Sequence, residues 1–353
     1  MSLAPDGPAW NNGAAMISLF DTGATALFDP LLLLLGAMLI DAYLGEFGPL
    51  FRILPHPVVI MGHAIGEADG RLNRPHRSAR DRRIRGMVAA LGLTAAAALV
   101  GIAVQWFSLT APGGWVVELL LISVLLAQKS LHDHVADVAR GLETGGLAAG
   151  RQAVRMVVGR DPDALDQPGV CRAAVESLAE NFSDGVVAPV FWYMVFGLPG
   201  LLAYKMINTL DSMIGHRTER HRDFGWASAR LDDIANVVPA RLSGVLIIAA
   251  AAALKGADPR AAWTIVRADA RRHRSPNAGW PEAAMAGALD IALSGPRQYH
   301  GRTTAEPWVG HGRARLGPTD IRRALRLYVH ACAATALLVG LVLVVRLTMT
   351  AAV

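Results

Sequence analysis

The chain has 353 residues, of which 53% are hydrophobic and 18% are charged, and its formal net charge is +5. Soluble domains are about one-quarter charged, so this composition excludes an ordinary soluble protein and favours one that is largely buried in a membrane. The basic residues alternate with apolar segments and form no nucleic-acid-binding motif, which argues against DNA or RNA as a partner.

Apolar stretches follow one another along the chain. They cover residues 27–44, 87–117, 119–127, 186–210, 237–254 and 327–347. A helix needs about 20 apolar residues to cross a bilayer, and only the second and the last stretch reach that length comfortably. The pattern predicts an all-α, polytopic helical membrane protein with about 4–6 spans and helical cytoplasmic loops. We expect residues 1–26 to form an N-terminal extension and residues 27–353 to form a single integral membrane domain.

The distribution of arginine indicates how these stretches are oriented. The basic segments between them are 71–85, 140–172, 217–230 and 260–326. The positive-inside rule puts all of them in the cytoplasm, yet single crossings on both sides of 217–230 would put that segment outside. We therefore predict re-entrant or broken helices: residues 186–210 would form a hairpin that turns at Leu198-Pro199-Gly200, and residues 237–254 would dip in and return or lie partly buried. A simple six-span bundle with one basic loop outside is the alternative.

Three acids near the middle of the chain have the spacing of one helix face. Glu176, Glu180 and Asp184 are four residues apart, which would stack them at a cost of about 0.2–0.5 kcal/mol per like-charge pair. A divalent cation would offset that repulsion, and Mg²⁺ is commonly held by one or two carboxylates together with substrate phosphates. A solvated helix face with arginine partners such as Arg172 is the alternative.

Two more polar motifs follow. Asn208 and Asp211 are three residues apart, and so are Asp233 and Asn236, so each pair shares a helix face. Polar groups at membrane depth are costly and are usually functional. Together with Asp232, these motifs predict a metal–phosphate site in general terms.

The segment between these motifs is rich in arginine. Arg217, Arg220 and Arg222 could clamp anionic groups, although contact with lipid headgroups is the alternative. His216 and His221 are five residues apart and do not share a helix face, so we do not expect them to bind a metal.

Two outlying motifs complete the picture. His56 lies in a rigid Leu-Pro-His-Pro turn, where a structural role is slightly favoured over a substrate contact. Trp280 lies in a loop that leads into a helix with Pro281 at an early position, and its ring either faces a large planar ligand or anchors the loop.

The sequence contains no Walker phosphate loop and no nucleophile elbow, so any ATP would be held by carboxylate-bound Mg²⁺ and arginines. The cysteines, Cys171 and Cys332, are too few for a disulfide framework.

The longer motifs resemble those of the CobD/CbiB family of cobalamin biosynthesis proteins. They are AENFSDGVVAP (179–189), YKMINTLDSM (204–213), FGWASARLDD (224–233), PARL (239–242), LPHP (54–57), SPNAGWPE (275–282) and VVGRD (157–161). The resemblance covers about residues 27–299, and motifs of this length in this order are specific. The first 25 residues have no counterpart, and His216 and His221 stand where relatives often carry tyrosine.

This resemblance implies an adenosylcobinamide-phosphate synthase. ATP, with Mg²⁺, would activate a propionate carboxylate of adenosylcobyric acid, and the amine of (R)-1-aminopropan-2-ol, or of its O-phosphate, would attack to give an amide. The resemblance further implies a multi-pass protein of the cytoplasmic (inner) membrane with its active site facing the cytoplasm. A homo-oligomer and an assembly with other enzymes of the pathway are both compatible with it.

On this basis we hypothesise roles for individual residues. The expected ligands of Mg²⁺-phosphate are Glu180, Asp184, Asp211, Asp232 and Asp233. Glu180 and Asp184 would also take part in catalysis, and Glu176, or less favourably His56, would accept a proton from the attacking ammonium. Substrate or nucleotide contacts are expected from Asn181, Lys205, Asn208, Arg217, Arg220, Arg222, Arg230, Asn236, Arg241, Asn277 and Trp280.

Two other classes of function share the spacing features. A membrane prenyl- or phospho-transferase also places acidic motifs over Mg²⁺-diphosphate in a helical cavity, but it needs a long lipid tunnel. A transporter would also use broken helices, although the long polar segment 254–326 argues mildly against it. The spacing of the polar residues does not separate these readings from the ligase, which is favoured by the resemblance.

Overall fold

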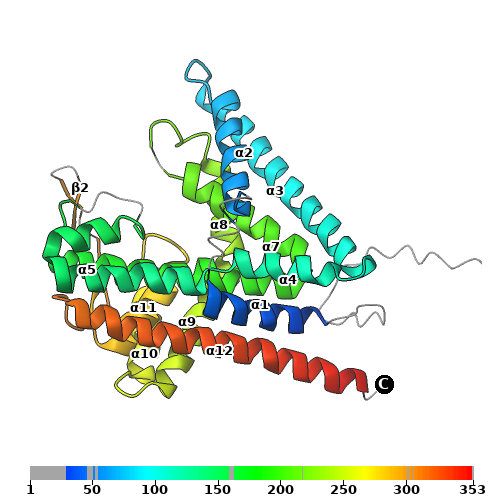
Figure 1. Cartoon of the computed structure of the whole chain (residues 1–353). Coiled ribbons are helices and arrows are strands. Elements are labelled where there is room, and N and C mark those ends of the chain that lie inside the picture. Colours follow the sequence, from blue (N-terminus) through cyan, green and yellow to red (C-terminus); the bar gives the residue numbers. More distant parts are fainter. Residues whose placement is uncertain are drawn as a thin grey trace, which may run out of the picture.

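The protein is almost entirely helical (Figure 1). The computed structural model describes residues 29–45, 51, 55–158, 163–216, 218–299, 302–304 and 306–351, so the predicted extension 1–26 lies outside the described residues. The long helices are α1 (Pro30–Leu44), α2 (Pro57–Leu72), α3 (Ala79–Thr110), α4 (Gly114–Leu125), α5 (Gln128–Val154), α6 (Gln167–Phe182), α7 (Ala188–Ile214), α8 (Trp226–Ala235), α9 (Val237–Ala253), α10 (Pro259–Asp269), α11 (Gly279–Leu289) and α12 (Pro318–Ala351).

Short polar signals in the sequence fix where several helices begin. The Asp29 carboxylate accepts from Leu31 N at 2.8 Å, and the Nδ1 atom of His56 accepts from Val58 N at 3.2 Å. Both caps are followed by proline at the first helical position, where its missing N–H costs nothing. His56 therefore caps helix α2 through its Nδ1 atom, which is the structural role that the sequence slightly favoured.

The protein is a polytopic helical membrane protein, as predicted. Among the described residues, four helical stretches are long and apolar enough to cross a bilayer, or five if α8 and α9, which meet at a 46° bend, count as one. Leu99 and Trp106 on α3 and Leu337 and Leu341 on α12 are at least 60% exposed, and such a surface requires lipid. The apolar stretch 87–117 is not one helix, however. Helix α3 ends at Thr110 and α4 begins at Gly114, and Gly113 between them has a φ of 76°.

The predicted hairpin at residues 186–210 is confirmed. Helix α7 reverses direction at Gly197 (φ 65°, ψ −153°), a conformation that favours glycine. The hydroxyl of Tyr204 consequently donates to the carbonyl of Asp184, 20 residues earlier, at 3.1 Å. Gln105 of α3 accepts from the backbone N of Leu198 at 3.1 Å, which satisfies a backbone group that lipid could not.

The corresponding prediction for residues 237–254 is only partly right. Helix α9 runs from Val237 to Ala253 without reversal, so it does not dip in and return, and Pro239 is accommodated in its first turn. Much of one α9 face is buried, which agrees with the second form of the prediction.

Two hydrophobic cores meet near the middle of the molecule. One joins α5, α6, α9, α10, α11 and the first half of α12. The other joins α1, α2, α3, α4, α7 and the second half of α12. In Figure 1, α5, α10 and α11 lie on the left, while α1, α4 and the end of α12 extend to the right. The connection between α11 and α12 also contains two small antiparallel sheets that the sequence did not indicate, β1 (Leu293–Ser294) with β4 (Trp308–Val309) and β2 (Arg297–Tyr299) with β3 (Arg302–Thr304).

Candidate active site

A π-helical turn links α6 to α7 where the two cores meet. It spans Ser183–Val187, and turns of this kind often occur at functional sites because they displace side chains and free backbone groups from the regular ladder. Here the carbonyl of Gly185 accepts from Ala127 N at 3.1 Å, and the carbonyl of Asp184 accepts from Tyr204. The turn thereby fixes the position of the Asp184 carboxylate.

Carboxylates from four segments, α6, the π-turn, α7 and α8, meet beside this turn. The acid cluster comprises Glu180, Asp184, Asp211, Asp232 and Asp233. Asp184 lies close enough to Glu180, Asp211 and Asp232 for their charges to interact, and Asp211 and Asp232 each interact with Asp233 in the same way. The reversal of α7 explains this meeting, because it brings Asp211 at the end of α7 back towards Asp184 at its start. Glu180 is exposed, and the four aspartates are half-buried.

Few donors offset these negative charges. Lys205 of α7 is close enough to Asp184 and to Asp41 of α1 for electrostatic interaction. Asn208 donates to Asp232 at a long 3.5 Å. Asn236 is buried, and its Oδ1 accepts from the hydroxyl of Tyr204 at 3.0 Å, whereas its Nδ2 has no hydrogen-bond partner.

Residues from the distant 275–282 motif complete one edge of the cluster. The Nδ2 of Asn277 donates to the carbonyl of Asp233 at 2.8 Å, and Arg241 lies 3.5 Å from Asn277 Oδ1. The Arg241 guanidinium stacks over the ring of Trp280, 4.6 Å from its centroid. Arg230 donates to Asp233 at 3.1 Å. All four of these predicted contact residues are therefore tied to the acid cluster through direct or shared contacts.

Other predicted site residues lie elsewhere. Glu176, one turn before Glu180, is buried, and it accepts from the backbone N of Ser294 at 2.7 Å, so strand β1 separates it from the cluster. The exposed Asn181 donates back to the carbonyl of Ser177 at 2.9 Å. The three acids 176, 180 and 184 thus do not form one open stripe, because β1 covers its first member. Arg217 lies outside the described residues, and Arg222 is exposed.

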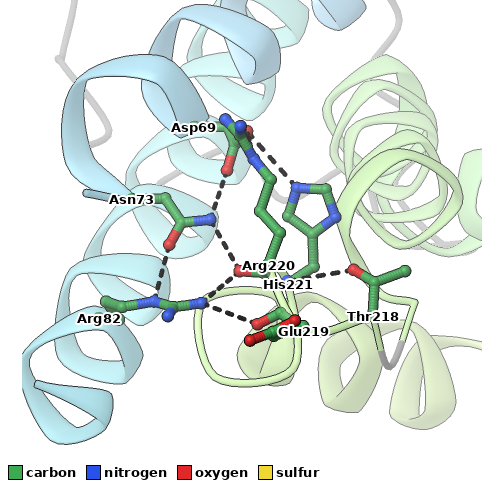
Figure 2. A network of polar contacts seen from close by, with 7 residues as sticks. All are labelled: Asp69, Asn73, Arg82, Thr218, Glu219, Arg220 and His221. Atoms are coloured by element: carbon green, nitrogen blue, oxygen red, sulfur yellow. Dashed lines mark hydrogen bonds and ion pairs between the residues drawn. The ribbon is translucent and has the colours of Figure 1, made fainter. Parts of the chain in front are cut away.

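Arg220 belongs to a second polar network, shown in Figure 2. The Asp69 network comprises Asp69 and Asn73 of α2, Arg82 of α3, and Arg220 and His221 of the α7–α8 loop. Asp69 accepts from Arg220 at 2.6 and 3.1 Å and from Asn73 at 2.8 Å, and the Nε2 of His221 lies 3.5 Å from the same carboxylate. Asn73 also donates to the carbonyl of Arg220 at 3.0 Å and accepts from Arg82 at 2.9 Å.

This network has an architectural consequence. Burial raises the pKa of Asp69, but the hydrogen bonds from Asn73 and Arg220 and the charge of Arg220 outweigh it, and the net pKa is below its ordinary value. The guanidinium of Arg220 is therefore committed to Asp69, which favours a structural role over the predicted contact with phosphate. The contacts also hold the basic α7–α8 loop beside the arginine-rich end of α2 and α3, so the two basic segments lie on the same side of the molecule.

A cavity of about 410 Å³ adjoins the acid cluster. Its polar lining groups are His56, Ser130 and Lys205, and the remaining walls are apolar side chains from α2 and from the α4–α5 junction. Lys205 therefore stands between the cavity and Asp184. His56, predicted as a contact or a capping residue, both caps α2 and lines this space.

Three residues of the site were not predicted. Tyr204 holds the π-turn, and Asp41 with Gln128 anchors the start of α5: the Asp41 carboxylate accepts from Gln128 N at 2.7 Å. Asp41 interrupts an apolar stretch, which is a signal of function or of specific pairing. The partner of that carboxylate is 87 residues away, so the sequence could not identify it.

The donor chemistry of the cluster suits magnesium. Within the described part of the chain, no group of three or more His, Cys, Asp or Glu side chains is arranged to hold a metal ion. The acid cluster nevertheless offers only carboxylate oxygens, which Mg²⁺ prefers. Because Mg²⁺ usually takes one or two carboxylates and keeps water and substrate phosphates as its other ligands, the cluster fits a metal that arrives with a nucleotide.

Comparison with known proteins identifies the family. The model of the CobD/Cbib protein family matches residues 34–328. The chain belongs to the CobD/CbiB family. The protein named Cobalamin biosynthesis protein CobD from a Sinorhizobium species is 54% identical over 305 residues, which cover 86% of this chain and 94% of that protein. The CobD proteins of Rhizobium meliloti and Rhodobacter capsulatus are 52% and 49% identical, and each match covers 86% of this chain and at least 93% of the relative. No solved structure matches.

Membership in the CobD/CbiB family confirms the resemblance inferred from the motifs. The match extends across both cores and includes every element of the acid cluster. The protein therefore belongs to a family of cobalamin biosynthesis proteins and acts within a membrane.

Proposed function

We propose that the protein is an ATP-dependent amide ligase that joins (R)-1-aminopropan-2-ol, or its O-phosphate, to a propionate carboxylate of adenosylcobyric acid. The observation that carries this proposal is the meeting of five carboxylates from α6, the π-turn, α7 and α8. Such an excess of negative charge at membrane depth requires a cationic ligand. Magnesium bound to ATP phosphates supplies one.

The reaction has two steps. A propionate oxygen attacks the terminal phosphorus of ATP, and the bond from that phosphorus to the bridging oxygen breaks. ADP departs, and the propionate becomes an acyl phosphate. The amine nitrogen then attacks the acyl carbon, inorganic phosphate leaves with the electron pair of the broken carbon–oxygen bond, and the nitrogen loses a proton. Bound Mg²⁺ supplies charge neutralisation at the phosphates and so favours their displacement.

The residues of this chain would divide the work. Asp211 and Asp232, from α7 and α8, are the proposed pair of Mg²⁺ ligands, because they lie near each other on separate helices. Asn208, which reaches Asp232 at 3.5 Å, is the proposed donor to phosphate oxygens. Glu180, at the exposed edge, would accept the proton from the amine. This role replaces the one expected for Glu176, which is bound to the backbone of Ser294.

The same geometry supports a cytoplasm-facing active site as part of this proposal. The reversal of α7 returns residue 214 to the side of the membrane from which residue 188 starts, and the Asp69 network holds the basic α7–α8 loop against the arginine-rich end of α2 and α3. The positive-inside rule then places the acid cluster on the cytoplasmic face of the inner membrane, where ATP is available.

The test uses purified protein in detergent or lipid. We expect mass spectrometry to detect the amide product from adenosylcobyric acid, amine, ATP and Mg²⁺, and Asp211→Asn to reduce its rate by about 10²-fold or more. Asp137→Asn, which changes a half-exposed acid on α5 paired with Arg140, is the matched control and should keep full activity. Full activity of Asp211→Asn would remove it from the site. Turnover of an isoprenoid diphosphate in place of amide formation would favour the transferase reading.

A further inference from the structure

The cavity beside Lys205 has the composition of a small-ligand subsite. Its volume of about 410 Å³ lies at the lower end of the range of ligand pockets, roughly 300–1,000 Å³. Such a space accepts a short-chain molecule and is far too small for a corrin macrocycle. Apolar walls from Val58, Val124 and Leu126 would contact a short carbon chain, while Lys205 and Ser130 bring donors.

Lys205 is the deciding residue in this space. Among the described residues, its ammonium makes no hydrogen bond and no ion pair within 4 Å, although it is half-buried near the two acids Asp184 and Asp41 and lines the cavity. An ammonium has three donors, and no side chain of the described residues uses them here. An acceptor supplied by a ligand in the cavity would satisfy them.

Ser130, near the start of α5, adds a second donor. Its hydroxyl lines the cavity, while the first N–H of α5, that of Gln128, already donates to the Asp41 carboxylate at 2.7 Å. On the far side of Lys205 lies the acid cluster. A ligand that has an anionic end at Lys205 and Ser130 and an ammonium end towards Asp184 matches both charges.

We propose that this cavity is the subsite of the amine co-substrate, with Lys205 and Ser130 as specificity-determining residues that bind an anionic ester group at the end remote from the amine. This inference rests on the proposed ligase function. It separates the site into two parts: the acid cluster holds the nucleotide, and the cavity delivers the amine to the activated carboxylate past Lys205. The cavity forms no covalent bond, so its residues affect amine binding and not carboxylate activation.

The experiment separates these two parts. Hydroxylamine captures an acyl phosphate as a hydroxamate and needs no amine subsite, so hydroxamate formation reports carboxylate activation alone. Lys205→Met and Ser130→Asp are compared with wild type for hydroxamate formation and for the KM of the O-phosphorylated amine and of the free amino alcohol. Lys129→Met, next to Ser130 but paired with Asp133 outside the cavity, is the matched control.

We expect both cavity variants to raise the KM for the phosphorylated amine by about tenfold or more. Hydroxamate formation should stay within about twofold of wild type in Ser130→Asp and should fall less than amide formation in Lys205→Met, because Lys205 also lies beside Asp184. Ser130→Asp should discriminate further, because its negative charge repels the anionic ester and leaves the free amino alcohol less affected. The inference is overturned if the variants impair hydroxamate formation as much as amide formation, or if both amines respond alike.

Binding provides a readout that does not depend on turnover. Calorimetry with the phosphorylated amine, the free amino alcohol and inorganic phosphate, each without ATP, should show tighter binding of the anionic ligands to wild type and its loss in Lys205→Met. Equal binding by wild type and Lys205→Met contradicts the proposed subsite. Wild-type protein that forms neither hydroxamate nor amide would instead contradict the ligase function itself, whatever the binding result.

Discussion

The two polar clusters around the α7–α8 loop are built in opposite ways. In the Asp69 network, one carboxylate receives hydrogen bonds from Asn73 and Arg220 and faces His221. In the acid cluster, five carboxylates lie close together, with a long contact from Asn208, an ion pair between Arg230 and Asp233, and the charge of Lys205. The first surrounds a single carboxylate with donors, and the second gathers carboxylates against one another.

This difference distinguishes a network that stabilises the fold from a cluster that is suited to binding a ligand. A satisfied polar network fixes one arrangement of the chain, and the Asp69 network accordingly ties the α7–α8 loop to α2 and α3, where Gly86 also lets the backbone of Phe224 approach closely. Mutually repelling carboxylates oppose folding and are retained where a ligand offsets them. The comparison therefore predicts opposite responses of activity and stability when a carboxylate is neutralised in each cluster.

The largest expected effect is on activity in the acid cluster. Asp232→Asn keeps the shape of the side chain and removes one charge that faces Asp184, Asp211 and Asp233. We expect amide formation to fall by about 10²-fold or more, while the Tm without ligand stays unchanged or rises because repulsion is relieved. Activity assays and thermal melting in detergent check this. A lower Tm with retained activity would show that the cluster is structural and would break the comparison.

The Asp69 network should respond in the reverse way. Asp69→Asn and Arg220→Gln, alone and combined, form a double-mutant cycle, and we expect a coupling of about 1 kcal/mol in stability, with kcat reduced far less than in Asp232→Asn. Glu67 and Arg71 form a matched control pair on the same helix, with side chains 60% and 75% exposed, and their coupling should be at most about 0.5 kcal/mol. If Arg220→Gln lowers the affinity for Mg²⁺-ATP and leaves stability unchanged, Arg220 contacts phosphate, as the sequence predicted, and its role is not structural.

Part of this arrangement could be predicted from the sequence. The Gly-Leu-Pro-Gly break and the conflict among basic segments predicted the α7 hairpin, because both signals are local or compositional. The turn lies slightly before its predicted position at Leu198-Pro199-Gly200, because Gly197 makes the reversal. Pro199 fits the first turn of the returning arm. The family motifs predicted which acids belong to one site, and the structure brings Glu180, Asp211 and Asp233 into the same cluster.

The sequence could not identify partners that are distant in the chain. Arg220 is paired with a carboxylate 151 residues away, and Glu176 with a backbone N–H 118 residues away, so composition and spacing could not reveal either contact. The π-turn has no sequence signature, because it depends on the packing of Tyr204 and Ala127 against it. Spacing thus indicated which residues carry charge, whereas tertiary contacts decide which of those charges are already satisfied.

The smallest expected effect is the pH dependence of the Asp69 network. The pKa of Asp69 is lower in the folded protein than its ordinary value, so the folded state binds the proton less tightly than the unfolded state does. Its stabilisation is therefore fully present above the unfolded pKa, about 3.9, and is lost as the pH falls through the folded value. Arg220 and His221 of the loop face this carboxylate, Arg82 of α3 contacts its neighbour Asn73, and the arginines keep their charge over this range.

His221→Gln removes the titratable neighbour and provides the clean background for this measurement. In that background, Asp69→Asn should lower the Tm by a constant amount at pH values well above 4, and the difference should shrink as the pH falls from about 5 towards 3. A difference that stays constant down to the lowest pH would mean that the charge of Asp69 contributes nothing beyond the shape of its side chain. The acid cluster should show the opposite slope, because protonation there removes repulsion, so the two clusters can be told apart by the sign of the response alone.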